Sequence, residues 1–240
     1  MRTLFFTLIL AMTSCHADDE AKRALDDARR LASQGDYEAA LEKHVWFHNH
    51  ALSIERSYYG VRLSFALSDW IQLGAKYPKA LETLKEIRDT KTSKLVAGQG
   101  NRELFHDVES INERLGESAA TVELFKRLET SDLAFAATLY DLADDALLEA
   151  HEFTLARKYL GNPAERLSAA QYFYTEGMQF ANSSPAHNAS RQAVENIFAA
   201  NVVRLMTVLN ETGDKDGAKA IQAEALKTLE NDSIRKALPQ

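Results

Sequence analysis

Apolar residues recur at helical spacing along almost the whole chain. Between residues 21 and 32 the apolar positions follow one another in steps that place them on one face of a helix. The segment SQGD (residues 33–36) interrupts this run, and a second run of the same kind begins at Tyr37. No stretch alternates apolar and polar residues for long enough to predict a strand. The pattern therefore predicts an all-α protein.

Composition supports this prediction and excludes one class of partner. The chain has only ten glycines and four prolines in 240 residues, which favours long helices over turn-rich β structure. This length is enough to bury a sizeable core, in one elongated domain or two compact ones. The net charge of −7 argues against a nucleic-acid binder, which needs a basic surface to displace counterions from phosphates.

Residues 1–17 have the build of an export signal. A positive charge at Arg2 precedes the apolar run LFFTLILAM (residues 4–12), which is too short to span a bilayer. The run leads to Cys15 in a context that resembles a bacterial lipoprotein box, where the cysteine is lipidated and becomes the first residue. Cleavage after Ala17, with Cys15 discarded, is the alternative. Both routes predict an exported protein without a free thiol, whose folded domain covers residues 18–240 and which is either periplasmic or held at the membrane only by a lipid on Cys15.

Turn signals recur along the mature chain. The segment GDYEAALEKHVWFHNHAL (residues 35–52) resembles the turn and second helix of a tetratricopeptide repeat, with a small-then-large Ala-Leu pair where helices approach closely. Weaker versions of this turn fall at Gly74, Gly116 and Gly213, and at His151, which stands in place of the glycine. The resemblance to the tetratricopeptide-repeat family implies an α-solenoid of stacked helix pairs with a concave binding face.

Two segments depart from a regular repeat. Residues 91–100 (KTSKLVAGQG) predict an inserted loop or short helix, and residues 182–185 (NSSP) predict the clearest internal break. No single helix pair of this chain can bury its apolar face alone, so we expect stacked pairs that share one core.

Three histidines lie close together in EKHVWFHNH (residues 42–50). On a helical wheel, His44 and His48 fall on the buried stripe, whereas Trp46 and His50 fall on the opposite side. The i, i+4 spacing of His44 and His48 is that of paired metal ligands, but zinc needs a third protein ligand and no HExxH motif is present. We therefore expect both to be neutral core histidines that hydrogen-bond across helices, with no metal.

The family resemblance also suggests which side chains line a concave groove. One non-core stripe on the first helix of each pair faces the groove in such repeats, so His106, which points away from the core, is either a solvated histidine or one that lines the groove. Asp141, Asp145 and Glu149 form an acidic row, which fits either a solvated helix face or a groove wall that selects a basic peptide. By this alignment the groove residues are Glu103, His106, Ser110 and Glu113 in the third unit, and Thr138, Asp141 and Asp145 in the fourth.

Catalytic motifs are missing from the sequence. It contains no glycine-rich phosphate loop, no Gly-x-Ser-x-Gly, and no nucleophilic cysteine once Cys15 is used. We therefore expect a non-catalytic interaction or scaffold module of the bacterial envelope that needs no cofactor. It docks a partner helix or peptide, and the partner is basic if the acidic row forms the groove wall. One alternative is a metal-binding protein or enzyme that uses His44, His48 and His106. Another is a small-molecule or lipid carrier whose aromatic stripes line a cavity.

Overall fold

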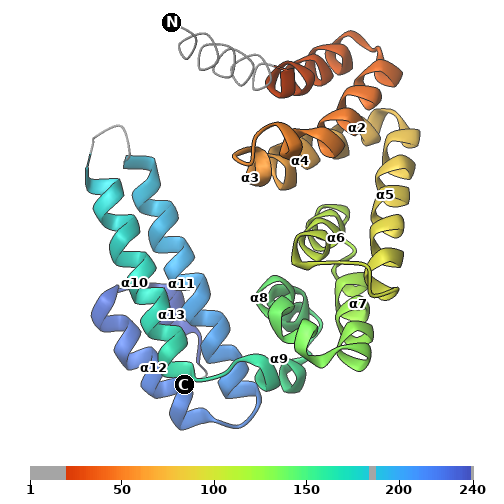
Figure 1. Ribbon diagram of the computed structural model, residues 1–240. Helices are drawn as coiled ribbons and strands as arrows, with labels where there is room; N and C mark the ends of the chain where they lie inside the picture. The colour runs from red at the N-terminus through yellow and green to blue at the C-terminus, as the bar shows by residue number, and fades with distance from the viewer. Residues whose placement is uncertain (1–19, 184–187, 239–240) are drawn as a thin grey trace, which may run out of the picture. The chain divides into compact units, whose positions relative to one another are not determined.

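The structure of the chain is a computed structural model that describes residues 20–183 and 188–238 (Figure 1). These residues are almost entirely helical and contain no strand, so the all-α prediction is confirmed. The chain divides into two compact units, unit 1 (Met1–Leu128) and unit 2 (Glu129–Gln240). No helix in the described ranges is long and apolar enough to cross a membrane. The predicted export signal, with Cys15, lies outside the described residues.

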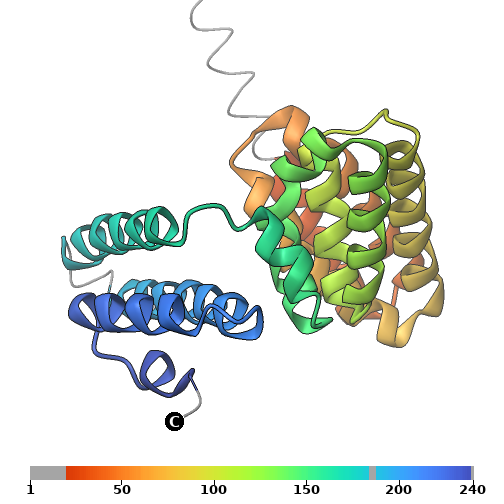
Figure 2. The same ribbon diagram turned by 90° about the horizontal axis from the view of Figure 1, so that it is seen from below.

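Unit 1 packs each helix against its neighbours in the chain. After a helical segment at residues 20–34, α2 contacts α4, α4 contacts α5, and α5 contacts α6 (Figure 2). The core between them includes Leu67, Trp70, Leu84 and Ile111, all at most 1% exposed. The helices are α2 (Tyr37–Ile54), α3 (Tyr58–Leu63), α4 (Phe65–Lys76), α5 (Pro78–Val96), α6 (Arg102–Leu115) and α7 (Ser118–Ser131).

Unit 2 is built on a long antiparallel hairpin formed by α10 and α11 (Figure 1). Helix α12 packs against both helices of the hairpin, and α8 and α9 pack against α11. Phe198, Met206 and Leu209 bury one side of α11 in the core. The helices are α8 (Leu133–Glu149), α9 (Phe153–Tyr159), α10 (Pro163–Asn182), α11 (Asn188–Glu211), α12 (Lys215–Thr228) and α13 (Asp232–Lys236).

Four of the predicted turns close in the same way. Gly35, Gly116 and Gly213 have φ of 83°, 70° and 88°, and His151 has φ of 58°. At each turn the following N–H donates to the carbonyl five residues earlier, at 2.8–3.0 Å, which is the closure of a Schellman motif. His151 thus adopts the left-handed conformation that glycine adopts elsewhere, at a cost of about 1 kcal/mol because of its Cβ. The turns predicted at these four positions are confirmed.

The turn predicted at Gly74 was wrong. Gly74 lies inside α4, where an added Cβ would fall 2.3 Å from Cγ of Leu81. The glycine there lets α4 and α5 approach closely rather than reversing the chain. The chain turns three residues later instead: α4 ends at Lys76, and Pro78 occupies the first turn of α5.

The predicted insertion at residues 91–100 is mostly helix. Helix α5 continues to Val96, because Leu95 is buried and Lys91 finds partners in the core. Gly98, at φ 72°, then ends the helix with a fifth turn of the same kind. At the predicted break, α10 ends at Asn182 and α11 begins at Asn188, with residues 184–187 outside the described part.

Candidate binding groove in unit 2

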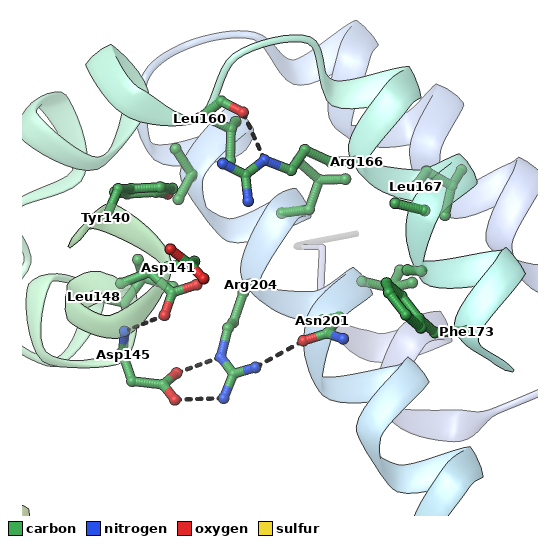
Figure 3. Close-up of a pocket in the computed structure, with 16 residues that line it drawn as sticks. Tyr140, Asp141, Asp145, Leu148, Leu160, Arg166, Leu167, Phe173, Asn201 and Arg204 are labelled. Carbon is green, nitrogen blue, oxygen red and sulfur yellow. Dashed lines mark hydrogen bonds and ion pairs between the residues drawn. The ribbon is translucent and has the colours of Figure 1, made fainter. Parts of the chain in front are cut away.

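A pocket of about 380 Å³ opens between α8, α10 and α11 of unit 2 (Figure 3). Its volume lies within the range of typical ligand sites. Charged and aromatic side chains from all three helices line it, and small residues of α10 leave the space between them. The lining includes Tyr140, Asp141, Asp144 and Asp145 on α8, Arg166 and Phe173 on α10, and Asn201 and Arg204 on α11.

The wall formed by α8 is acidic. Asp141, Asp144 and Asp145 lie on one side of this helix, because residues three and four positions apart share a helix face. Arg204 of α11 binds both carboxylate oxygens of Asp145, with Nη2 and Oδ2 at 2.5 Å, and its Nη1 donates to Oδ1 of Asn201 at 3.0 Å. This bidentate pair neutralises one carboxylate and joins α8 to α11.

Asp144 is half-buried in the pocket without a cationic partner. Its Oδ1 accepts a hydrogen bond from the backbone N–H of Asp145 at 2.8 Å, and no lysine or arginine in the described ranges forms an ion pair with it. Burial, with the nearby charge of Asp145, raises the pKa of Asp144 to about 6, although Arg204 opposes the shift. At neutral pH the pocket therefore holds a carboxylate that would be stabilised by a cation.

The opposite side of the pocket carries Arg166 of α10. Its Nε donates to the carbonyl oxygen of Leu160 at 3.0 Å, and its guanidinium lies over the ring of Tyr140, 5.4 Å from the centroid. This cation–π contact and hydrogen bond hold Arg166 in place. Burial raises the pKa of Tyr140 to about 12, so its hydroxyl stays protonated.

An apolar pocket of about 300 Å³ continues from the charged one along the hairpin. The two pockets share Ala170, Phe173 and Asn201. Phe173 is 70% exposed and Ile197, which lines the second pocket, is 61% exposed. We call the two pockets together the unit 2 groove: acidic beside α8 and apolar beside Phe173 and Ile197.

The structure divides the sequence-predicted groove residues between the two units. Asp141 and Asp145 line the unit 2 groove, and both face the pocket in Figure 3. The residues on α6 belong to unit 1 and have other surroundings there. Arg56 donates to Glu103 at 3.1 Å, Tyr59 Oη and His106 Nδ1 lie 2.7 Å apart, Ser110 is buried at 5% exposure, and Glu113 is exposed. Ser110, expected on an open face, is therefore part of the interior.

His44 and His48 lie in the core of unit 1, as the helical wheel predicts. They are 2% and 5% exposed, and burial lowers their pKa values to about 4 and about 3, so both are neutral at pH 7. His44 stacks on Trp70 with centroids 5.5 Å apart, and its buried Nδ1 has no hydrogen-bond partner among the described residues. Nε2 of His48 lies 2.8 Å from Nζ of Lys91, which confirms a bond across helices for His48 alone. In the described ranges no group of three or more His, Cys, Asp or Glu residues could hold a metal ion.

His48 belongs to a buried charge network that the sequence did not reveal. Nη1 of Arg62 donates to Oδ2 of Asp107 at 3.0 Å, Nη2 binds Oδ1, and Nζ of Lys91 also binds Oδ2. Burial alone would raise the pKa of Asp107, but Arg62 and Lys91 outweigh it and hold that pKa below the ordinary value. Both carboxylate oxygens are thus occupied from α3 and α5. We call Arg62, Lys91, Asp107 and His48 the unit 1 network.

Sequence reasoning also missed Asp144, Arg166 and Arg204. Asp144 carries a local signal, because it lies three residues after Asp141 and beside Asp145 on the same helix. The two arginines carry none, because only the packing of α10 and α11 brings them to α8. No family model, curated protein or solved structure matches the chain.

Proposed function

We propose that this protein is a non-catalytic binding module whose unit 2 groove holds a segment of a partner protein. The observation that carries the proposal is the half-buried carboxylate of Asp144, which forms no ion pair with the described lysines and arginines and shares its pocket with the exposed side chain of Phe173. A segment with a lysine or arginine next to apolar residues complements both features.

The acidic end of the groove favours a cation. A carboxylate removed from water is costly unless it is paired, so an arriving lysine or arginine stabilises ionised Asp144. Asp145 is already paired with Arg204, which leaves Asp144 as the better acceptor for an added charge. Binding should therefore weaken below pH 6, where Asp144 becomes protonated.

The apolar end of the groove supplies the affinity that one ion pair lacks. Burying a Phe- or Ile-sized side chain contributes about 1.5–3 kcal/mol, whereas a solvent-exposed ion pair contributes about 1 kcal/mol or less. Phe173 and Ile197 are both more than half exposed and lie in one pocket. Covering them is the larger gain, and Asp144 determines which segments are accepted.

The observed chemistry fits the two rival functions less well. A lipid carrier needs an apolar cavity, but the larger pocket is lined by three aspartates and two arginines. A metal centre built on His48 would compete with Lys91 for Nε2 of that histidine. We further propose, from the lipoprotein-like start and the tetratricopeptide-like turns, that the module works in the bacterial envelope and is tethered through Cys15.

A peptide-display selection tests the proposed function. Random peptides of about 20 residues, the length of α10, are selected on the wild-type chain. We expect enriched sequences to combine lysine or arginine with apolar residues, and to lose binding to Asp144→Lys and to Phe173→Asp.

Two control variants change similar residues outside the groove. Glu224→Lys reverses an exposed charge on α12, and Phe65→Asp replaces a phenylalanine that is 66% exposed on α4. Binding to both controls should equal binding to the wild type. Enriched peptides that bind all four variants alike, or no enrichment at all, would contradict the proposed function.

A further inference from the structure

The open side of the α10–α11 hairpin has the spacing of a helix-packing seam. Along α10, steps of four and three connect Arg166, Ala170 and Phe173, which line the groove, and the same steps continue on that helix face to Gly177 and Phe180. Along α11 the steps are also four, three, four and three, through Ser190, Val194, Ile197, Asn201 and Arg204, of which the last four line the groove. Alternating steps of three and four are the repeat that lets another helix insert its side chains between two others.

A residue without a side chain lies at the bottom of this seam, and large exposed apolar side chains lie along its two edges. At Gly177 an added Cβ would fall 2.9 Å from Cγ2 of Val194, so the two helices approach closely there. Phe173 and Phe180 on α10 are 70% and 59% exposed, and Ile197 on α11 is 61% exposed. The floor and rims form a channel between two antiparallel helices, which is the shape that an added helix fills.

The other side of the same hairpin already holds a helix. Helix α12 packs against both α10 and α11, and Nε2 of Gln171 donates to Oγ1 of Thr228 at 2.9 Å across that contact. Gln171 lies on the side of α10 away from Phe173 and Phe180. The hairpin therefore carries α12 on one side, and on the other side an apolar pocket that only residues of α10 and α11 line in the described part of the chain.

The two ends of the open seam differ in charge, so they can fix the orientation of a bound helix. Asp141, Asp144 and Asp145 border it beside α8, and Asp144 has no cationic partner in the described ranges. Away from α8 the rims are the apolar Phe173, Ile197 and Phe180. A partner helix with a basic residue at one end only would therefore bind in one orientation.

We propose that the occupant of the unit 2 groove is an amphipathic α-helix of another protein, with apolar residues in alternating steps of three and four and a lysine or arginine at the end that reaches Asp144. The seam from Arg166 to Phe180 is about 21 Å long, which corresponds to about four helical turns. This inference rests on the proposed function and adds the conformation and orientation of the bound segment.

Two synthetic peptides of about 18 residues, with the same composition, test the conformation of the occupant. The first has leucines spaced by three and four residues in turn, as on one face of a helix, and a lysine near one end. The second has the same leucines at every second position, as on one face of a strand. We expect the first to bind at least about 10-fold more tightly by fluorescence anisotropy and to gain helical circular dichroism when bound. A central proline in the first peptide should remove its binding.

A matched pair of variants locates the bound peptide. Ala170→Phe fills the floor of the seam, and Ser168→Phe adds the same side chain at an exposed position on another face of α10. We expect Ala170→Phe to weaken binding of the first peptide by about 10-fold or more and Ser168→Phe to leave it unchanged.

Different failures separate the inference from the function that it rests on. If library-selected peptides bind the groove but tolerate a central proline, or if the strand-patterned peptide binds as well as the helical one, the helical occupant is overturned and the proposed function stands. A wild-type dimer that Phe173→Asp converts to monomer would make a second copy of the chain the occupant and would also overturn the inference. If the library yields no groove binder, both fall together.

Discussion

The unit 1 network and the unit 2 groove place similar charged groups in opposite situations. In unit 1, Asp107 is 4% exposed, and both of its carboxylate oxygens are bound by Arg62 and Lys91. In unit 2, Asp144 is half-buried at a pocket and receives one backbone hydrogen bond but no cation from the described residues. The pKa of Asp107 is accordingly held below the ordinary value of an aspartate, whereas that of Asp144 is raised to about 6.

This difference distinguishes a structural charge from one available to a ligand. A buried carboxylate with all its acceptors occupied joins helices and gains nothing from a further partner. A half-buried carboxylate without a cation raises the free energy of the unbound protein, because the charge is partly removed from water. A bound cation offsets this penalty. Removing the charge of Asp107 should lower the stability of the fold. Removing the charge of Asp144 should weaken partner binding without lowering stability.

The largest effect is expected from Asp107→Ala. The substitution leaves Arg62 and Lys91 buried without their shared counter-charge, which should lower the free energy of unfolding by about 3–5 kcal/mol. Urea denaturation at pH 7, followed by circular dichroism, measures this loss. A change below about 1 kcal/mol, the usual value of a surface ion pair, would show that the network is not structural.

Acidification should affect the two units in opposite directions. The folded-state pKa values of His44 and His48 are about 4 and about 3, below the ordinary 6.5, so stability present above pH 6.5 is lost as the pH falls. By pH 5 this loss in unit 1 should reach about 4 kcal/mol, about 2 kcal/mol for each histidine. The folded-state pKa of Asp144 is raised from 3.8 to about 6, so protonation between these values stabilises unit 2.

Hydrogen exchange resolved by segment measures this contrast. After correction for intrinsic rates, segments of α2 should lose protection between pH 7 and pH 5, whereas segments of α10 and α11 should keep or gain it. The variant His48→Gln should weaken the pH dependence of α2. A parallel loss of protection in both units would contradict the account.

Asp144→Asn should stabilise the free protein modestly. At pH 7 the substitution removes an ionised carboxylate that the pocket disfavours, which should add about 1–2 kcal/mol to the free energy of unfolding. At pH 4, where Asp144 is already protonated, the variant and the wild type should be equal. Thermal unfolding at the two pH values provides the comparison, and destabilisation at pH 7 would show that Asp144 has a structural partner.

The smallest effect concerns His151, which closes its turn with a φ of 58°. His151→Gly should stabilise unit 2 by up to about 1 kcal/mol, because glycine adopts left-handed backbone without a steric cost. The same turn geometry at Gly116, with φ of 70°, supplies the control. Gly116→Ala should destabilise by a similar amount, and an unchanged stability in both variants would contradict the shared role of these turns.

The sequence predicted the helices and most turns because those depend on local chemistry. Gly35, Gly116, Gly213 and His151 were recognised as turns from their immediate neighbours, and each has positive φ. The same kind of local pattern wrongly predicted a turn at Gly74. This glycine allows α4 to pack closely on Leu81 and does not reverse the chain. A glycine in a helix and a glycine in a turn look alike until the neighbouring helix is known.

The candidate site was predicted less completely, because it is assembled from distant segments. Asp141 and Asp145 were named from the acidic row on one helix, and both line the groove. Arg204, which neutralises Asp145, could not be found without the packing of α11 on α8. The pairing of charges distinguishes the unit 2 groove from the unit 1 network, and it is a tertiary property that no local pattern records.

Titration of the Asp144 carboxyl by carbon-13 NMR tests the central claim most directly. In the free protein we predict a pKa of about 6, and in the presence of a groove-binding peptide that carries a lysine or arginine we predict a lower value. Asp107 should stay ionised over the pH range in which Asp144 titrates, because its pKa lies below the ordinary value of an aspartate. A free Asp144 that titrates at or below the ordinary 3.8, or a raised pKa that bound cationic peptide leaves unchanged, would contradict the account of an unpaired carboxylate that recognises a partner.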